Sequence, residues 1–261
     1  MMSCKGTECC YKVALMSPRK TIVELQKISS GLAHGCEALR FGPKVAAVYN
    51  PLLYASRPHN MYLELAGADP KKVIFLGMNP GPWGMAQTGV PFGEVAAVRE
   101  WLGIEAEVRK PEREHPKRPI EGFACARAEV SGRRLWGLFR ERFGTPGEFF
   151  REHFVTNYCP LVFMDLKGAN ITPDKLPAEE TAPLFEMCDR ALAGTIKLLE
   201  PQWVIGVGGF AKKRIDKVKD KSGLNFFTAQ ILHPSPASPR ANAGWDTDVV
   251  KTLTELGIWK Q

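Results

Sequence analysis

The sequence predicts an α/β fold of three layers, in which helices cover both faces of a central, mainly parallel four-stranded sheet. Short apolar runs alternate with longer amphipathic stretches, an order typical of parallel strands joined by helices. The chain has 261 residues, of which 44% are hydrophobic, and this is enough to bury a large core. The apolar runs that predict the strands lie at 73–76, 154–156, 203–207 and 226–232.

Helices are predicted where apolar residues recur at helical spacing. The first covers 21–41, where Ile22, Leu25 and Ile28 share one face and Gly42 and Pro43 end the pattern. Later helices are predicted at 59–65, 94–102, 131–143 and 180–199, and after Gly209. The charged segment 105–123 is expected to be a solvated loop. Residues 1–16 are expected to form a flexible N-terminal extension, and residues 17–261 a single domain.

The charge of the chain suits a partner that carries phosphate groups. The formal net charge is +7 and the pI is near 9.0, and a basic surplus attracts polyanions. No stretch near the N-terminus resembles a signal peptide, and no apolar run approaches the length of about 20 residues that spans a membrane. We therefore expect a soluble monomer that contacts no membrane, in the cytoplasm of a prokaryote or the nucleus of a eukaryote.

The seven cysteines fall into two groups. Four lie in apolar stretches and are expected to be buried free thiols, namely Cys36, Cys125, Cys159 and Cys188. Cys4, Cys9 and Cys10 lie together near the N-terminus, but they lack the C-x2-C pair expected of an iron–sulfur site. Because no other group of residues has the spacing of metal ligands, we expect neither a metal nor another cofactor.

Each predicted strand is followed by a polar or glycine-rich stretch. In open parallel sheets, ligands bind at the carboxyl ends of the strands. We therefore expect these stretches to meet around one cleft. They are Met78-Asn79-Pro80-Gly81, Asn157-Tyr158, Gly208-Gly209 and His233-Pro234-Ser235.

The loop at 77–93 is dense in glycine and proline. It lacks the Gly-Lys-Ser/Thr ending of a phosphate-binding P-loop, and no G-x-G-x-x-G opens a helix there. Glycine and proline fix the shape of a backbone that another molecule approaches closely. The loop is therefore expected to form part of a binding site.

These motifs resemble those of the single-strand-selective monofunctional uracil-DNA glycosylases. Residues 77–95 (GMNPGPWGMAQTGVPFGEV) resemble the first motif of the family, and 233–236 followed by 240–245 resemble the second. Residues 157–161 match the segment between them, and the similarity covers nearly the whole chain after Met16. The resemblance implies a uracil-DNA glycosylase fold. It also implies a metal-free enzyme that flips uracil out of DNA and hydrolyses the N-glycosidic bond.

The chemistry of the reaction gives each matched residue a role. The ring of Phe92 can stack on the flipped base, and the amide of Asn157 can donate to O4 of uracil and accept from N3–H. His233 can donate to O2, where negative charge accumulates as the base leaves. Asn79 cannot act as a general base, so we expect it to orient the attacking water. No lysine follows in the motif to form a Schiff base, which agrees with a monofunctional enzyme.

The resemblance also places Met78 and Gly81 at the base. A bulky residue near C5 would exclude any 5-substituent, whereas glycine at position 81 leaves room for water or a small polar group. The family therefore implies 5-hydroxymethyluracil as a second substrate. Xanthine and hypoxanthine stay open as preferred bases, because one glycine does not fix the size of a pocket.

Two further sets of residues are expected to contact DNA. Lys213, Lys217 and Lys221 recur every fourth residue and would line one helix face. Residues 235–245 resemble the family's wedge, which enters the base stack in place of the flipped base. Its expected DNA contacts are Ser235, Pro236 and Arg240.

The sequence departs from the family at two of these positions. Ala237 stands where animal members typically have Arg, and Arg240 is the candidate replacement. Trp83 stands where the family usually has Phe, which is a milder change.

Two functions of other classes remain as alternatives. One is a non-catalytic DNA-binding module on the same scaffold, against which the presence of both Asn79 and His233 argues. The other is an enzyme of free nucleotides or nucleosides, against which the missing P-loop lysine and the basic surplus argue. The sequence does not choose between single- and double-stranded DNA.

Overall fold

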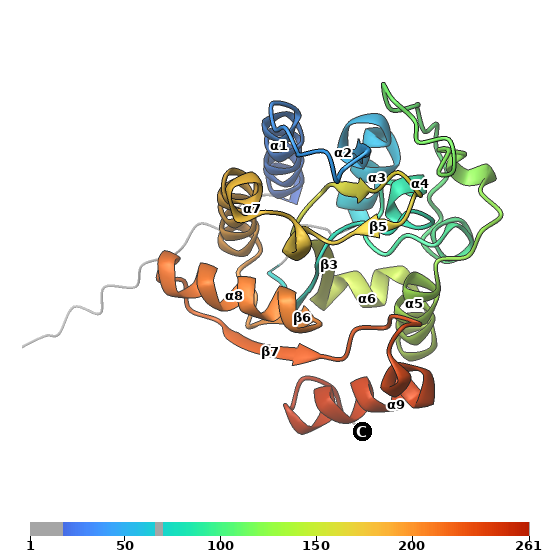
Figure 1. Ribbon diagram of the computed structural model, residues 1–261. Coiled ribbons are helices and arrows are strands. Elements are labelled where there is room, and N and C mark those ends of the chain that lie inside the picture. Colours follow the sequence, from blue (N-terminus) through green and yellow to red (C-terminus); the bar gives the residue numbers. More distant parts are fainter. Residues whose placement is uncertain (1–17, 66–69, 261) are drawn as a thin grey trace, which may run out of the picture.

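The structure is a computed structural model that describes residues 18–65 and 70–260. The predicted extension at 1–16, with Cys4, Cys9 and Cys10, lies outside the described residues. The elements follow one another along the chain as Figure 1 shows: α1 (Pro18–Glu37), β1 (Ala47–Tyr49), α2 (Pro51–Tyr54), α3 (Ser56–Leu65), β2 (Val73–Gly77), α4 (Met85–Thr88), π-helix η1 (Ala97–Trp101), 3-10 helix η2 (Gly122–Ala124), α5 (Val130–Phe143), α6 (Pro146–Glu152), β3 (His153–Asn157), β4 (Val162–Met164), β5 (Asn170–Ile171), 3-10 helix η3 (Pro173–Lys175), α7 (Ala178–Leu199), β6 (Trp203–Val207), α8 (Gly209–Ser222), β7 (Phe227–Ile231) and α9 (Pro239–Glu255).

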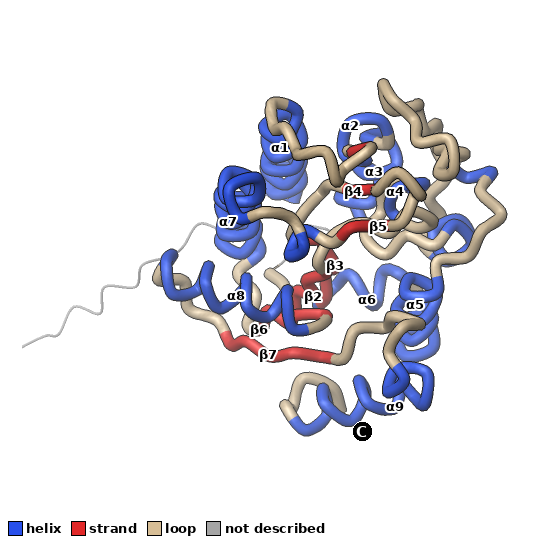
Figure 2. Tube along the Cα trace, viewed as in Figure 1, coloured by secondary structure: helices blue, strands red, loops and turns tan. Residues whose placement is uncertain are grey.

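The central sheet has the four predicted strands in the order β3-β2-β6-β7, and all its pairs are parallel. Helices α7 and α8 cover one face, with α1 packed on α7, and α5, α6 and α9 lie on the other (Figures 1 and 2). Strand β2 is buried along its whole length, as expected of a strand covered on both faces. The predicted three-layer α/β fold is therefore confirmed.

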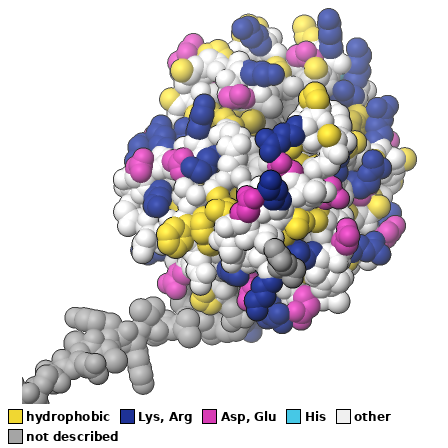
Figure 3. Space-filling view, turned by 90° about the horizontal axis from the view of Figure 1, so that it is seen from below, with side chains coloured by type: hydrophobic (Ala, Val, Ile, Leu, Met, Phe, Trp, Pro, Cys, Tyr) yellow, Lys and Arg dark blue, Asp and Glu magenta, His cyan; other side chains and the backbone are white. Residues whose placement is uncertain are grey.

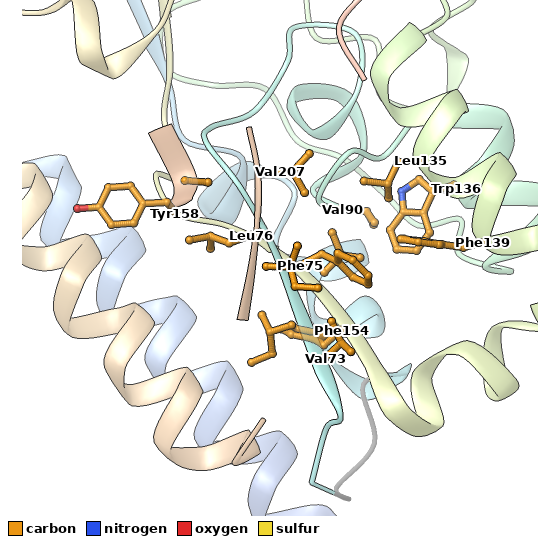
Figure 4. Packing of buried hydrophobic residues seen from close by; sticks show 14 of the residues in the cluster. Val73, Phe75, Leu76, Val90, Leu135, Trp136, Phe139, Phe154, Tyr158 and Val207 are labelled. Atoms are coloured by element: carbon orange, nitrogen blue, oxygen red, sulfur yellow. The ribbon is translucent and has the colours of Figure 1, made fainter. Parts of the chain in front are cut away.

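Side chains of the strands alternate between two apolar layers. Phe75 points toward α5, where its ring centroid lies 5.2 Å from that of Phe139, next to Trp136 (Figure 4). Leu76 and Tyr158 point toward the opposite helices. This alternation buries both faces of the sheet and leaves the carboxyl ends of its strands for the loops that follow.

The structure differs from the sequence prediction at several elements. Helices α6 and α9 were not predicted, and α1 ends at Glu37, before the predicted end at residue 41. Strands β1, β4 and β5 form a second, antiparallel sheet. Each has three residues at most, which is too short to show an alternation of polar and apolar residues. The helix predicted at 94–102 contains a π-helical turn, η1. The prediction of a solvated loop at 105–123 was wrong in part, because His115 and Ile120 are buried there and Tyr49 holds the segment through the carbonyl of Arg118.

The four cysteines expected to be buried free thiols are free and buried in the structure. In the described ranges, no helix is long and apolar enough to cross a membrane.

A buried ion pair joins α7 and α8 to the end of β3. The guanidinium of Arg214 lies 2.6 Å from Asp189, and the two side chains are 11% and 14% exposed. The hydroxyl of Tyr158 donates to the same Asp189 oxygen at 2.8 Å. Tyr158 directly follows Asn157, so this cluster fixes the chain where β3 ends.

We expect Asp189→Ala to lower the free energy of unfolding by about 3–5 kcal/mol, because it leaves a buried guanidinium without its partner. The matched control is Glu186→Ala, which removes the carboxylate from an exposed pair with Arg190 on the same helix and is expected to cost less than about 1 kcal/mol. Urea unfolding measures both. Equal losses for the two variants would contradict the role given to the cluster.

Candidate active site

The carboxyl ends of neighbouring strands lie side by side, so the loops that follow them emerge together. Gly77 of β2 pairs with Asn157 of β3, and the N–H of Tyr158 donates to the Gly77 carbonyl at 2.9 Å. The N–H of Gly208, after β6, donates to the carbonyl of Ile231 at 2.9 Å. The sequence motifs therefore meet at one edge of the sheet, as predicted.

Phe92, Asn157 and His233 gather around two glycines. A Cβ atom on Gly77 would collide with Oδ1 of Asn157 and lie 2.6 Å from Cε2 of Phe92. The ring centroids of Phe92 and His233 are 6.2 Å apart. Gly208 has a φ of +91°, and a Cβ there would lie 3.2 Å from Cβ of His233. Both glycines are needed because functional side chains approach their backbone closely.

In the amide of Asn157, the nitrogen has a hydrogen-bond partner and the oxygen has none among the described residues. Its Nδ2 donates to the sulfur of Met85 at 3.2 Å. Its Oδ1 is buried and has no hydrogen-bond partner among the described residues. A buried acceptor left unpaired costs about 1–3 kcal/mol, so this oxygen is suited to accept a hydrogen bond from a bound ligand.

Asn79 is held by its amide nitrogen. Its Nδ2 donates to the carbonyl of Leu161 at 3.2 Å, and its Oδ1 accepts no hydrogen bond from the described part of the protein. The neighbouring Met78 is fixed through its carbonyl, which accepts from the N–H of Cys159 at 2.9 Å. This arrangement leaves the oxygen of Asn79 available to a water molecule.

Phe92 has an uncommon backbone conformation, with a φ of +54°. Such a conformation persists in a non-glycine residue when its surroundings over-determine it. Three buried side chains fix the carbonyls around Phe92: Trp136 donates to Pro91 at 3.1 Å, Thr88 donates to Gly93 at 2.9 Å, and His59 bonds to Gly89 at 2.8 Å.

The backbone on both sides of His233 is also fixed by side chains. Trp245 donates to the carbonyl of Leu232 at 2.6 Å, and Arg134 donates to that of Pro234 at 3.2 Å. Burial lowers the pKa of the His233 imidazole from 6.5 to about 4. The ring is therefore neutral at pH 7 and can donate a hydrogen bond from only one nitrogen.

The carboxyl group of Glu129 fills the space beside Gly81, and the sequence analysis did not identify this residue as part of the site. A Cβ on Gly81 would lie 2.5 Å from Oε2 of Glu129. Burial raises the pKa of this carboxyl above its usual value, although the N–H of Trp83 donates to it. That Gly81 leaves room for a 5-substituent of the base stays a prediction.

The residues predicted to contact DNA are spread along two helices. Lys213, Lys217 and Lys221 are exposed on α8. This helix leaves the site at Gly209 and returns to the start of β7, so Lys221 lies at the opposite edge of the sheet from the site. These lysines therefore form a stripe that leads away from the site.

The predicted wedge is a tight turn followed by a helix. The N–H of Ala237 donates to Oγ of Ser235 at 3.2 Å, and Pro236 is exposed. Ser238 then caps α9. Arg240 is 73% exposed and pairs with Asp248 of α9 at 2.5 Å. Its predicted role as replacement for an arginine at position 237 stays a prediction.

Most residues that position the site could not be recognised from the sequence. His59 and Trp136 lie in apolar helical patterns and resemble ordinary core residues, and Arg134 resembles a surface charge. Trp245 lies in the second motif, but its hydrogen bond to Leu232 was not predicted. In the described residues, no group of three or more His, Cys, Asp or Glu side chains is placed to hold a metal ion. The N-terminal cysteines lie outside that part of the chain.

The carboxyl ends of the parallel strands thus bring together an aromatic ring, an unpaired amide oxygen and a neutral histidine. A family model described as the "Uracil DNA glycosylase superfamily" matches residues 66–256. The chain thus belongs to this superfamily.

Similar proteins narrow the assignment. The chain is 44% identical over 254 residues to the "Single-strand selective monofunctional uracil DNA glycosylase" of Bos taurus, covering 93% of each chain. It is 49% identical over 220 residues to the protein of that name from Rattus norvegicus, covering 84% of this chain and 79% of the rat protein. It therefore belongs to the family of single-strand selective monofunctional uracil-DNA glycosylases, which confirms the resemblance seen in its motifs.

A solved structure confirms the fold independently. The crystal structure of Pedobacter heparinus SMUG2 superimposes with a TM-score of 0.63 at 16% sequence identity, covering 88% of this chain and 97% of that one. At this identity the likeness concerns the fold alone.

Gly132 of α5 generates a testable prediction. A Cβ on Gly132 would collide with the carbonyl oxygen of Phe92, whereas a Cβ on Gly137 of the same helix has nothing within 4 Å. We expect Gly132→Ala to lower the free energy of unfolding by about 1–3 kcal/mol through overpacking. The control Gly137→Ala should leave it unchanged or raise it by up to about 1 kcal/mol. Chemical unfolding compares the two, and unchanged stability in both would show that the contact with Phe92 constrains nothing.

Proposed function

We propose that this protein is a monofunctional DNA glycosylase of base excision repair. It flips uracil, and also 5-hydroxymethyluracil, out of DNA and hydrolyses the N-glycosidic bond to leave an abasic site. The observation that carries this proposal is the buried, unpaired Oδ1 of Asn157 beside Gly77 and Phe92. It is an acceptor suited to the N3–H of uracil, and the names of the similar bovine and rat proteins support the same reaction.

The contacts of Asn157 account for the choice of uracil over cytosine. Uracil donates from N3–H and accepts at O4, whereas cytosine accepts at N3 and donates from its amino group. Met85 presents a sulfur, which accepts a hydrogen bond only weakly. O4 of uracil can therefore replace this sulfur as the acceptor of the hydrogen bond from Nδ2 of Asn157. Cytosine would require the reversed amide, with Oδ1 against the sulfur, and this mismatch disfavours it.

The reaction proceeds by departure of the base before water attacks. The electron pair of the glycosidic bond leaves with the base, and the charge that develops on O2 accepts a hydrogen bond from neutral His233. Preorganised donors of this kind contribute about 3–4 kcal/mol in other enzymes. Water bound to Oδ1 of Asn79 then adds to C1′ of the sugar cation and releases its proton to solvent. Such a cation needs no strong base, which suits asparagine at this position.

The partner in this proposal is DNA, single-stranded as well as double-stranded, and the acting form is a monomer. The enzyme works where the genome is, in the cytoplasm of a prokaryote or the nucleus of a eukaryote. Phe92 and Asn157, with Met78 and Gly81, form the base pocket. Ser235 and Pro236, with Arg240, form the wedge, and Lys213 and Lys217 add charge on α8.

The proposed reaction is tested with a labelled oligonucleotide that contains one uracil, in the presence of EDTA, followed by alkali. We expect strand cleavage only after alkali, which reports an abasic site made without a divalent metal or lyase activity. A panel with 5-hydroxymethyluracil, xanthine and hypoxanthine ranks the bases. An intact strand on the whole panel, with binding retained, would favour the non-catalytic module.

Asn79→Ala and His233→Ala are each expected to lower the single-turnover excision rate at least about a hundredfold, because each removes a group that acts on the reacting atoms. Binding of uncleavable DNA should survive. Matched controls are Asn225→Ala and His34→Ala, which change exposed residues of the same types outside the site. Near-normal excision by both site variants would rule out the assigned roles.

The excision rate is expected not to change through protonation of His233 around pH 6.5. Burial lowers the pKa of His233 to about 4, so its ring is neutral throughout the range in which an ordinary histidine titrates. Single-turnover rates across this range, with the NMR titration of the His233 ring, provide the measurement. A ring midpoint near 6.5, accompanied by a change in rate, would contradict this expectation.

A further inference from the structure

Two arginines contact the indole of Trp83, which lies in the glycine-rich loop between Gly81 and Gly84. The guanidinium carbons of Arg118 and Arg127 are 4.8 Å and 4.6 Å from a ring centroid of Trp83. Contacts of this kind between a cation and an aromatic face stabilise the position of the cation. Two positive charges are thus held on one side chain of the candidate active-site loop.

The backbone around this cluster is fixed by Gln87, which is fully buried. Its Nε2 donates to the carbonyls of Pro82 and Pro119 at 3.0 Å and 3.2 Å, and its Oε1 accepts from the N–H groups of Glu121 and Gly122 at 2.8 Å and 3.1 Å. The bond to Pro82 lies within the loop that carries Trp83, and the other three join this loop to the segment that follows Arg118. The loop and this segment therefore form one unit.

The charges of the two arginines are not neutralised within the described protein. Neither guanidinium lies within 4 Å of a carboxylate, whereas Arg240 pairs with Asp248. Nε of Arg118 is buried without a hydrogen-bond partner among the described residues, and Arg127 is exposed. Both guanidinium groups contact Trp83 without a carboxylate partner, so their like charges repel each other, and an anion would relieve that repulsion.

The other basic side chains that were predicted to contact DNA differ from this cluster. On the face shown in Figure 3, Lys and Arg side chains are interspersed with acidic and apolar ones. Arg240 is paired with a carboxylate, and the lysines of α8 lead away from the site. The cluster of Arg118, Arg127 and Trp83 differs from both because its two arginines contact Trp83, which lies on the loop of Asn79.

We propose that Arg118 and Arg127, positioned by Trp83, bind a backbone phosphate of the DNA strand next to the flipped nucleotide. The planar fork of arginine matches the oxygens of a phosphodiester. Trp83 is four residues after Asn79, a span of at most about 14 Å of extended chain, which places the cluster within reach of the flanking phosphates. This inference rests on the proposed function, since it takes DNA as the substrate.

The test measures the salt dependence of binding to a single-stranded oligonucleotide that contains an uncleavable abasic-site analogue. Each phosphate contact contributes about 0.7 to the slope of log affinity against log salt concentration. Because the two arginines share one phosphate, the double variant is expected to lower the slope by about 0.7, and Arg118→Gln and Arg127→Gln each by part of that amount. Affinity for an undamaged oligonucleotide should fall by the same factor, because a phosphate contact carries no base information.

The matched control is Arg151→Gln, which removes the same charge from an exposed residue just before β3, at the opposite edge of the sheet. Its slope should equal that of the unchanged protein. Unchanged slopes for both Arg118→Gln and Arg127→Gln, or an equal loss in the control, would overturn the phosphate site. Because this DNA cannot be cleaved, reduced slopes together with absent excision would refute the proposed function while the phosphate site stands.

Discussion

The close approach of the loop after β2 to the rest of the site is the constraint on which the structure depends. Gly77 lets Phe92 and Asn157 come within reach of the end of β2, and Gly132 lets the carbonyl of Phe92 rest on α5. Each contact requires a backbone without a Cβ atom. Phe92 then adopts a positive φ, which the hydrogen bond of Trp136 to Pro91 helps to maintain. The ring of Phe92, which we propose to stack on the base, is therefore held in position before any base arrives, as preorganised binding requires.

The interior of the site carries little charge, and this suits a reaction whose charge develops on the leaving base. Asn79 and Asn157 are neutral amides, and burial keeps His233 neutral. Burial also favours the protonated form of Glu129 beside Gly81. A fixed anion here would repel the departing base, whereas oriented dipoles in a water-poor pocket stabilise it. The guanidinium groups of Arg118 and Arg127 contact Trp83 of the loop that carries Asn79, where we propose that they bind a phosphate and not the base.

The sequence predicted the parts of the fold that have a strong local signal. Strands β2 and β6 are continuous apolar runs, and β3 and β7 are partly apolar segments between helical patterns, so their places and direction could be inferred. The antiparallel sheet could not, because β1 pairs with β4 across more than a hundred residues and each has only three. The residues expected to act on the base were found through motifs, whereas Gln87, Glu129 and Arg134 act through contacts with distant segments. A single sequence does not reveal such pairs, since each partner alone resembles a core or surface residue.

The strand binding and the base reading that we propose depend on one framework. Asn79 and Trp83 belong to one loop, and Gln87 ties this loop to the segment after Arg118 by three hydrogen bonds. On the other side, the Glu129 carboxyl accepts from the N–H of Trp83, and Glu129 is the N-cap residue of α5, the helix whose Gly132 supports Phe92. A phosphate bound at Trp83 would thus contact the same framework that holds Asn79 and Phe92. Gln87 is buried in this framework and its side chain makes four hydrogen bonds. The geometry of the base pocket would therefore already be fixed when a DNA strand binds at Trp83.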